Sequence, residues 1–284
     1  MKKFTKRMLI LALAASLATG CAVAEDDDEI SMEDTGIIWE EVTYDDVAWD
    51  FPIDLSDMRP DLVVLANKHV LLSKDFIPEN LVKIPARKTN SDGSNKNGGV
   101  RKASSGEMQL TEECAAALVE LMEAANADGQ KLYLKSAYRS YRTQNTMYYN
   151  RMEKNNGKDD GWVAMPGSSD HQTGLGCDVV PGNWTDRGMN STMAKEEECQ
   201  WMAEHCHEYG FIIRYPEDKE DVTEINYEPW HLRYVGKAPA TYMMENGLCL
   251  EEFYEELQAA IQQFLDDGGN PKLVEDFIQV SAEN

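Results

Sequence analysis

Positive charge is scarce in this chain of 284 residues. Lys and Arg number 27 against 51 Asp and Glu, which gives a formal net charge of -24. Nucleic-acid-binding proteins need a basic stripe that meets the phosphates, so this balance excludes nucleic acid as a partner. An acidic exterior favours solubility and is not attracted to anionic lipid headgroups.

Several enzyme and metal-site signatures are also absent. None of the six cysteines forms a CxxC pair, which excludes a zinc knuckle. The chain contains no HExxH, the motif of thermolysin-like enzymes, and no S-x-x-K, the motif of the serine carboxypeptidases. Histidine occurs only five times, so a histidine in an unusual setting is a candidate for chemistry.

The first 24 residues have the pattern of a secretory signal. Early cations precede an apolar stretch from Met8 to about Ala18, which is too short to span a bilayer comfortably. "LATGC" resembles a bacterial lipobox with Cys21 as the lipidated residue, whereas "AVA" at 22–24 resembles an ordinary cleavage site. Either way we expect an extracytoplasmic monomer, secreted or held by a lipid at Cys21 to the outer face of the bacterial cytoplasmic membrane.

Beyond residue 24 the cysteines are odd in number, so at least one thiol is unpaired or pairs with another chain. Cys199 and Cys206 are seven residues apart, and on one helix they would be separated by a rise of about 10 Å. That separation exceeds the Cα spacing of a disulfide, which is at most about 7 Å. We therefore expect mostly buried thiols. The five residues are Cys114, Cys177, Cys199, Cys206 and Cys249.

The composition divides the rest of the chain into three parts. Residues 25–60 form an acidic tether and N-terminal arm, 61–250 the main domain, and 251–284 a C-terminal helix and tail. Within the domain, strands alternate with irregular loops and helices, which predicts an α+β fold with a mostly antiparallel sheet and flanking helices. Residues 61–72 are predicted to form a strand, and Thr111 is predicted to cap a helix.

One histidine lies in a Ser/Gly-rich loop, "SSDHQTGLGCDVV". His171 precedes Asp178 by seven residues, and Gly174 and Gly176 between them permit a tight backbone. Imidazole nitrogen and carboxylate oxygen are both zinc ligands. Taken alone the pair is weak evidence for a metal.

A second histidine lies in "NYEPWHLRYVG", where His231 begins an alternating strand pattern. Glu228 would face the opposite side of a regular strand. Pro229 cannot continue a ladder, so a bend there could bring Glu228 and His231 to a common site. The alternative is an edge strand with an incidental Glu.

A third segment, "LKSAYRSYRTQ", follows an apolar strand. Arg139 at a strand end could bind two carboxylate oxygens at once, or could be a surface residue in a turn. Together the three segments supply three metal ligands, a carboxylate that could take a proton from water, and an Arg that could hold a carboxylate or oxyanion. Another His pair, His205 and His207, would diverge on a helix and is predicted to be structural.

In this order, "SAYRSYRTQ", "SSDHQTGLGCDV" and "EPWHLRYVG" resemble the three motifs of the VanY-type D-alanyl-D-alanine carboxypeptidases, over about residues 61–247. The pattern S-x-H-x-x-G-x-x-x-D is met by Ser169, His171, Gly174 and Asp178, and E-x-W-H by Glu228, Trp230 and His231. The resemblance implies a Zn²⁺ site and the α+β fold shared with the Hedgehog-type peptidases. One departure is Cys177, which could compete as a thiolate if it faced the metal.

The resemblance also implies roles for individual residues. Zn²⁺ would be held by His171, Asp178 and His231, with Glu228 as general base and Arg139 as the second catalytic group. The candidate substrate-binding residues are Ser136, Tyr138, Gln144, Ser169 and Trp230. The implied activity is removal of the C-terminal D-alanine from a peptidoglycan stem peptide.

Two alternatives stay open. The same motifs serve an L,D-carboxypeptidase that acts on tetrapeptide stems, and specificity would depend on pocket walls such as the 87–107 loop. A non-catalytic cell-wall binding module would need neither Glu228 nor Arg139.

Overall fold

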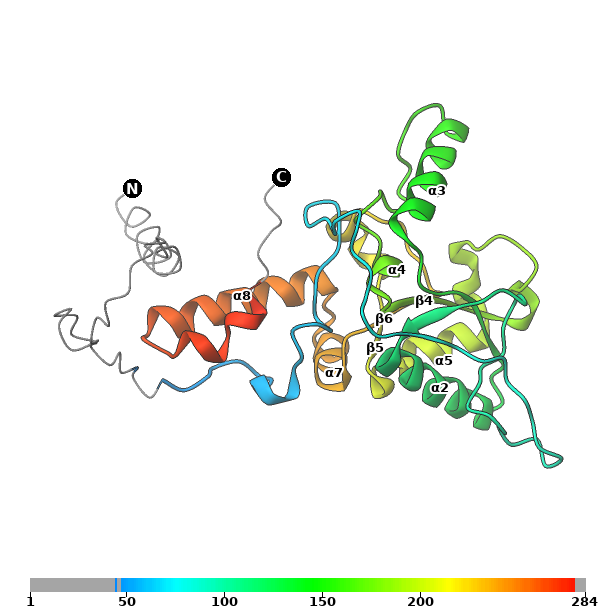
Figure 1. Ribbon diagram of the computed structural model, residues 1–284, viewed down its shortest axis with the longest axis horizontal. Helices are drawn as coiled ribbons and strands as arrows, with labels where there is room; N and C mark the ends of the chain where they lie inside the picture. The colour runs from blue at the N-terminus through cyan, green and yellow to red at the C-terminus, as the bar shows by residue number, and fades with distance from the viewer. Residues whose placement is uncertain (1–43, 45–46, 279–284) are drawn as a thin grey trace, which may run out of the picture. The chain divides into compact units, whose positions relative to one another are not determined.

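The computed structural model describes residue 44 and residues 47–278, so the expected signal segment and Cys21 lie outside the described residues. Its centre is a four-stranded antiparallel sheet in the order β3-β4-β6-β5 (Figure 1). The strands are β3 (Leu132–Ser136), β4 (Gly176–Pro181), β5 (Phe211–Ile213) and β6 (His231–Tyr234). A separate antiparallel pair consists of β1 (Leu81–Lys83) and β2 (Gln109–Thr111). This arrangement confirms the predicted α+β class.

α2 and α5 cover one side of the sheet, whereas the short helix α4 and the projecting helix α3 lie on the other side (Figure 1). The helices are α2 (Glu112–Ala127), α3 (Tyr141–Lys154), α4 (Asp170–Thr173), α5 (Glu197–His205), α6 (Glu220–Thr223), α7 (Lys237–Asn246) and α8 (Leu250–Asp266). α2 forms because apolar residues recur along one face, as at Cys114, Leu118, Leu121 and Ala125, all fully buried. Thr111 precedes the helix as predicted, but its side chain makes no capping hydrogen bond.

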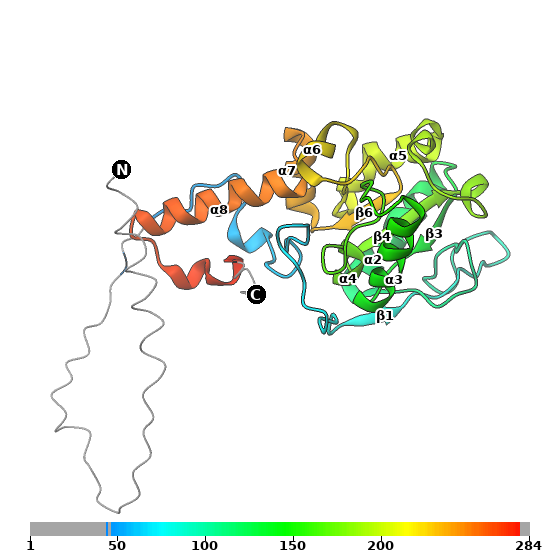
Figure 2. The same cartoon turned by 90° about the horizontal axis from the view of Figure 1, so that it is seen from above.

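A second apolar cluster joins the N-terminal arm to the C-terminal helix. Buried residues along α8 recur at helical spacing, among them Phe253, Leu257 and Phe264. Trp49 and Phe51 of the arm pack on these rings, and the Trp49 and Phe264 centroids are 5.8 Å apart. Figure 2 shows the arm and α8 side by side. Trp49 and Phe51 therefore have a structural role.

Residues 61–72 do not form the predicted strand. Leu62 packs into the main core, which α2 forms with the four-stranded sheet, and Val63 packs into the second cluster. This segment therefore bridges two cores instead of pairing with the sheet. The carbonyl groups of Leu62 and Val64 accept hydrogen bonds from Arg233. A side chain from another element thus takes the place of a strand partner.

The predicted buried thiols are confirmed. Cys114, Cys177, Cys199, Cys206 and Cys249 are all free and buried. Burial raises the pKa of Cys199 and of Cys206 to about 12, which keeps both thiols protonated at neutral pH. Among the helices of the described residues, none combines the length and apolar character needed to cross a membrane.

Candidate active site

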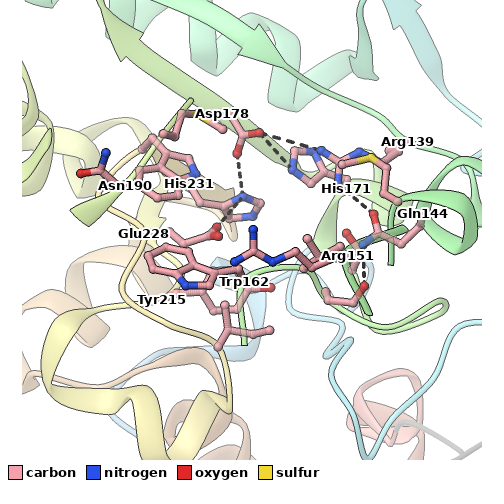
Figure 3. Close-up of a pocket in the computed structure, with 17 residues that line it drawn as sticks. Arg139, Gln144, Arg151, Trp162, His171, Asp178, Asn190, Tyr215, Glu228 and His231 are labelled. Atoms are coloured by element: carbon pink, nitrogen blue, oxygen red, sulfur yellow. Dashed lines mark hydrogen bonds and ion pairs between the residues drawn. The ribbon is translucent and has the colours of Figure 1, made fainter. Parts of the chain in front are cut away.

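Two central strands and the short helix α4 bring His171, Asp178 and His231 together (Figure 3). The β4–β6 register places Asp178 opposite His231. Gly174 ends α4 with a φ of 70°, a left-handed conformation that turns the chain back into β4. An added Cβ at Gly176 would lie 2.9 Å from the carbonyl carbon of Asp170, so only glycine permits this close return.

The three side chains are buried, and one ligand atom from each lies within 4.8 Å of the others. Nδ1 of His231 is 2.9 Å from one Asp178 carboxylate oxygen, and Nε2 of His171 is 3.4 Å from the other. Burial would raise the pKa of Asp178, but the two histidines outweigh it and hold the pKa well below its usual range. Asp178 is therefore a carboxylate between two imidazoles.

The tautomer of His171 suits a metal ligand. Its Nδ1 lies 2.7 Å from the carbonyl oxygen of Ala137, which can only accept, so Nδ1 carries the proton. Burial, together with the nearby Arg139, lowers the pKa of His171 to about 4, so the ring is neutral and Nε2 has a free lone pair. Neutral imidazole, carboxylate and imidazole form a donor set that fits zinc with an open position.

Cys177 does not belong to this group. Its side chain is fully buried in the main core, on the opposite side of β4 from Asp178. Burial raises the pKa of the thiol well above its usual value. The thiolate competition considered from the sequence is thus excluded by the strand's alternation.

The bend at Pro229 brings Glu228 to the same site. The backbone N–H of His231 donates to the carbonyl oxygen of Glu228 at 3.1 Å, which closes a turn. Oε2 of Glu228 is then 3.8 Å from Nδ1 of His231. Burial and the charge of Asp178 raise the pKa of Glu228 well above its usual value, and Arg139 opposes this rise.

Arg139 is held in place from three sides. Its backbone N–H donates to the carbonyl oxygen of His171 at 3.0 Å. Its guanidinium donates to Oε1 of Gln144 at 2.8 Å and to Oγ of Ser136 at 3.1 Å. The side chain is 16% exposed, and one guanidinium nitrogen is 3.9 Å from a carboxylate oxygen of Asp178. The guanidinium group therefore reaches the site and is still accessible to a ligand that enters from solvent.

These groups face one open pocket of about 430 Å³ (Figure 3). Eight residues singled out from the sequence line it: Arg139, Gln144, Ser169, His171, Asp178, Glu228, Trp230 and His231. Ser136 and Tyr138 do not line it: Ser136 supports Arg139, and the backbone N–H of Tyr138 donates to the carbonyl oxygen of Gln109. The 87–107 loop contributes no lining residue either.

Other lining residues were not identified from the sequence. They include Met147, Arg151, Trp162, Met189, Asn190 and Tyr215. Met147 and Arg151 follow Gln144 at helical spacing on α3, a periodicity that would have identified both. Trp162 stacks on Trp230 with ring centroids 6.3 Å apart, a contact that spacing cannot reveal. His205 pairs with Glu208 and lies outside the pocket, which agrees with its predicted structural role.

Comparison with known proteins identifies the family. The family model for VanY, D-alanyl-D-alanine carboxypeptidase, matches residues 107–237. "Putative carboxypeptidase YodJ" of Bacillus subtilis is 36% identical over 199 residues, which cover 70% of this chain and 68% of that protein. The chain belongs to the VanY family of D-alanyl-D-alanine carboxypeptidases.

Other relatives agree with this VanY-family assignment. The bifunctional D-Ala-D-Ala dipeptidase and carboxypeptidase VanXYC of Enterococcus gallinarum is 30% identical over 70% of this chain and 97% of that protein. The alignments to two D-alanyl-D-alanine carboxypeptidases, from Enterococcus faecalis and Enterococcus faecium, span about half of their length (52% and 45%).

Two solved structures share the VanY-family fold. The LdcB LD-carboxypeptidase matches with a TM-score of 0.60 and 34% identity, over 69% of this chain and 87% of that one. A mutant of the vancomycin-resistance D,D-pentapeptidase VanY, solved in complex with Zn(II), matches with a TM-score of 0.51 and 28% identity, over 68% and 98%. These similarities confirm the predicted fold and zinc dependence of the family.

Proposed function

We propose that this chain is a zinc-dependent D-alanyl-D-alanine carboxypeptidase that hydrolyses the last peptide bond of a peptidoglycan stem and releases D-alanine. The observation that carries the proposal is the convergence of Glu228 and Arg139 on the His171–Asp178–His231 cluster in one open pocket. A binding module would need the ligands alone. Glu228 and Arg139 beside the ligands supply what hydrolysis needs in addition, namely a group that transfers protons and a cation that stabilises the oxyanion.

Three residues would hold the metal: His171 through Nε2, Asp178 through its carboxylate, and His231 through Nδ1. These are the atoms that face one another. Bound there, zinc would supply a Lewis acid that polarises the peptide carbonyl and lowers the pKa of water. The remaining open position fits a catalytic rather than a structural zinc.

Glu228 is the group that moves protons in this mechanism. It takes a proton from the attacking water and delivers one to the amine of the departing D-alanine. A carboxyl that does both needs a pKa closer to neutrality than that of an exposed Glu, and the burial of Glu228 shifts its pKa in that direction. No covalent enzyme intermediate is required.

Arg139 holds negative charge on the substrate. Its planar fork can bind the terminal carboxylate bidentately or support the oxyanion that develops at the attacked carbonyl. Gln144 and Ser136 fix its two terminal nitrogens, so the fork is oriented before substrate arrives. We assign Gln144, Ser169 and Trp230 to binding of the peptide end, with Ser136 as support for Arg139.

A second candidate is an L,D-carboxypeptidase that trims D-alanine from tetrapeptide stems. The observation in its favour is the TM-score of 0.60 to the LdcB LD-carboxypeptidase. The test is the release of free D-alanine by the zinc-loaded protein from pentapeptide and tetrapeptide muropeptides. Release from pentapeptide alone supports the D,D activity, and release from tetrapeptide alone supports the L,D activity. No release from either contradicts both.

The location of the enzyme follows from its substrate. Peptidoglycan lies outside the cytoplasmic membrane, so we propose that residues 1–24 direct export and that Cys21 carries a lipid anchor. Residues 25–60 would then be the tether and arm of a domain at 61–250, with 251–284 as a C-terminal helix and tail. Labelling with a fatty-acid analogue is expected to mark the wild type, and a Cys21→Ser variant is expected to remain unlabelled.

A further inference from the structure

Four charged side chains lie buried directly beside the candidate active site. They are Asp170, Arg214, Arg233 and Glu251, with exposures of 0%, 0%, 0% and 6%. Each comes from a different part of the fold: α4, the residue after β5, β6 and α8. Buried charges are costly unless they are paired, so a cluster of four needs a reason.

The four groups form one continuous network. Nε of Arg214 donates to Asp170 at 2.6 Å, and its two terminal nitrogens donate to both oxygens of Glu251 at 2.8 and 2.7 Å. Arg233 pairs with the other oxygen of Asp170 and also donates to the carbonyl oxygens of Leu62 and Val64. The network therefore ties α8 to α4, the short helix that carries His171.

The network is attached to two of the proposed metal ligands. Asp170 immediately precedes His171 in the chain, and Arg233 follows His231 by two residues on β6. The backbone N–H of Arg214 donates to the carbonyl oxygen of His231 at 3.1 Å. Glu251 touches neither ligand and lies outside the segment 107–237 that matches the family model. Its influence on the site passes through Arg214.

The charge of Glu251 balances a buried guanidinium charge next to the site. Two guanidinium groups and two carboxylates sum to zero, so the network adds no net charge next to a site that must accept a dication. Without the charge of Glu251, one buried positive charge would be uncompensated. Because the interior screens weakly, that charge would oppose binding of Zn²⁺.

We propose that Glu251 of the C-terminal helix is a positioning residue of the active site, which neutralises Arg214 and thereby lets the His171–Asp178–His231 cluster bind a divalent cation tightly. The inference rests on the metal site proposed above. It makes α8 part of the catalytic unit.

The test is the zinc dissociation constant, measured by competition with a chromogenic chelator, alongside the melting temperature of the metal-free protein. Glu251→Gln keeps the size and removes the charge, and we expect zinc affinity to fall at least about 10-fold, as for lost outer-sphere partners. Glu252→Gln is the matched control. That neighbouring carboxylate pairs with Lys219 at 2.9 Å near the surface, and its loss is expected to leave zinc affinity unchanged.

A charge-balanced double variant separates charge from packing. Arg214→Gln combined with Glu251→Gln restores neutrality, so zinc affinity is expected to recover toward wild type even as the melting temperature drops further. If zinc affinity instead follows the melting temperature through all variants, Glu251 has only a structural role and the inference is wrong. If Glu251→Gln does not fold, Glu251→Asp carries the test: it retains the charge, and a 10-fold loss of affinity there would overturn the charge argument.

The result also separates this inference from the proposed function. A wild-type protein that binds no zinc would overturn both. A wild-type protein that binds zinc, with Glu251→Gln binding it equally well, would overturn the role of Glu251 alone.

Discussion

The carbonyl oxygen of Ala137 lies 2.7 Å from Nδ1 of His171 and fixes the proton on that nitrogen. Nε2 is thereby left free on the side that faces Asp178. Ala137 belongs to the segment that also supplies Arg139, so one stretch of chain orients both a candidate ligand and a candidate catalytic group. In metal sites, hydrogen bonds of this kind fix the tautomer and the ring orientation of a histidine ligand.

The first prediction concerns zinc content. His171→Ala removes one of three ligands, so the purified variant is expected to retain well under one zinc per chain after dialysis against buffer with trace chelator. Metal content by mass spectrometry checks this. His205→Ala is the control, because that histidine pairs with Glu208 outside the pocket. Full zinc content in His171→Ala would remove the residue from the ligand set.

The second prediction concerns Glu228. Glu228→Gln preserves the shape of the side chain but cannot accept the proton of water, so kcat is expected to fall by at least about 100-fold. Zinc content and melting temperature are expected to stay near wild type. Undiminished turnover would show that another group acts as the base.

A third prediction tests the geometry of Arg139. Arg139→Lys keeps the charge but loses the fork that Gln144 and Ser136 hold, and kcat/KM is expected to drop about 100-fold. Arg142→Lys provides the comparison, since Arg142 is exposed and lies outside the pocket. Equal rates for the two variants would mean that charge alone suffices at position 139.

A fourth prediction is an acid-stability signature of Asp170. Burial would raise its pKa, but Arg233 and Arg214 outweigh burial and lower the pKa in the folded state. A carboxyl whose pKa is lower in the folded than in the unfolded state stabilises the fold at pH values above its unfolded pKa, which is about 3.9 for Asp. This stabilisation is lost as the pH falls below that value. We therefore compare the free energies of unfolding of the wild type and of Asp170→Asn, measured by urea titration in the presence of chelator. The difference between them is expected to be constant above about pH 5 and to become smaller below about pH 4. A difference that stays flat down to pH 3 would contradict the assignment.

The candidate site could be predicted from short-range signals in the sequence together with the resemblance of three segments to known motifs. Gly174 and Gly176 marked a tight turn between His171 and Asp178, and Pro229 marked the bend that brings Glu228 to His231. The fold class followed from strands and helices with clear periodicity. Each of these signals is local.

What the sequence did not reveal depends on contacts between distant segments. The pattern of residues 61–72 predicts a strand, but the carbonyl groups of Leu62 and Val64 accept hydrogen bonds from Arg233, which lies 171 and 169 residues away in the sequence. The stacking of Trp162 on Trp230 and the reach of Glu251 to Arg214 are likewise long-range. Tyr138 is a substrate-binding candidate from its place after the strand, but it does not line the pocket, and its backbone N–H donates to the carbonyl oxygen of Gln109.

The most direct test of the account is D-alanine release from a pentapeptide muropeptide by the same protein sample in three states: as purified, after removal of metal by chelator, and after addition of one equivalent of zinc. We expect release, loss of release and recovery in these three states, with Glu228→Gln inactive in the zinc-loaded state. Release that survives complete removal of metal, or that zinc does not restore in a folded protein, would contradict it.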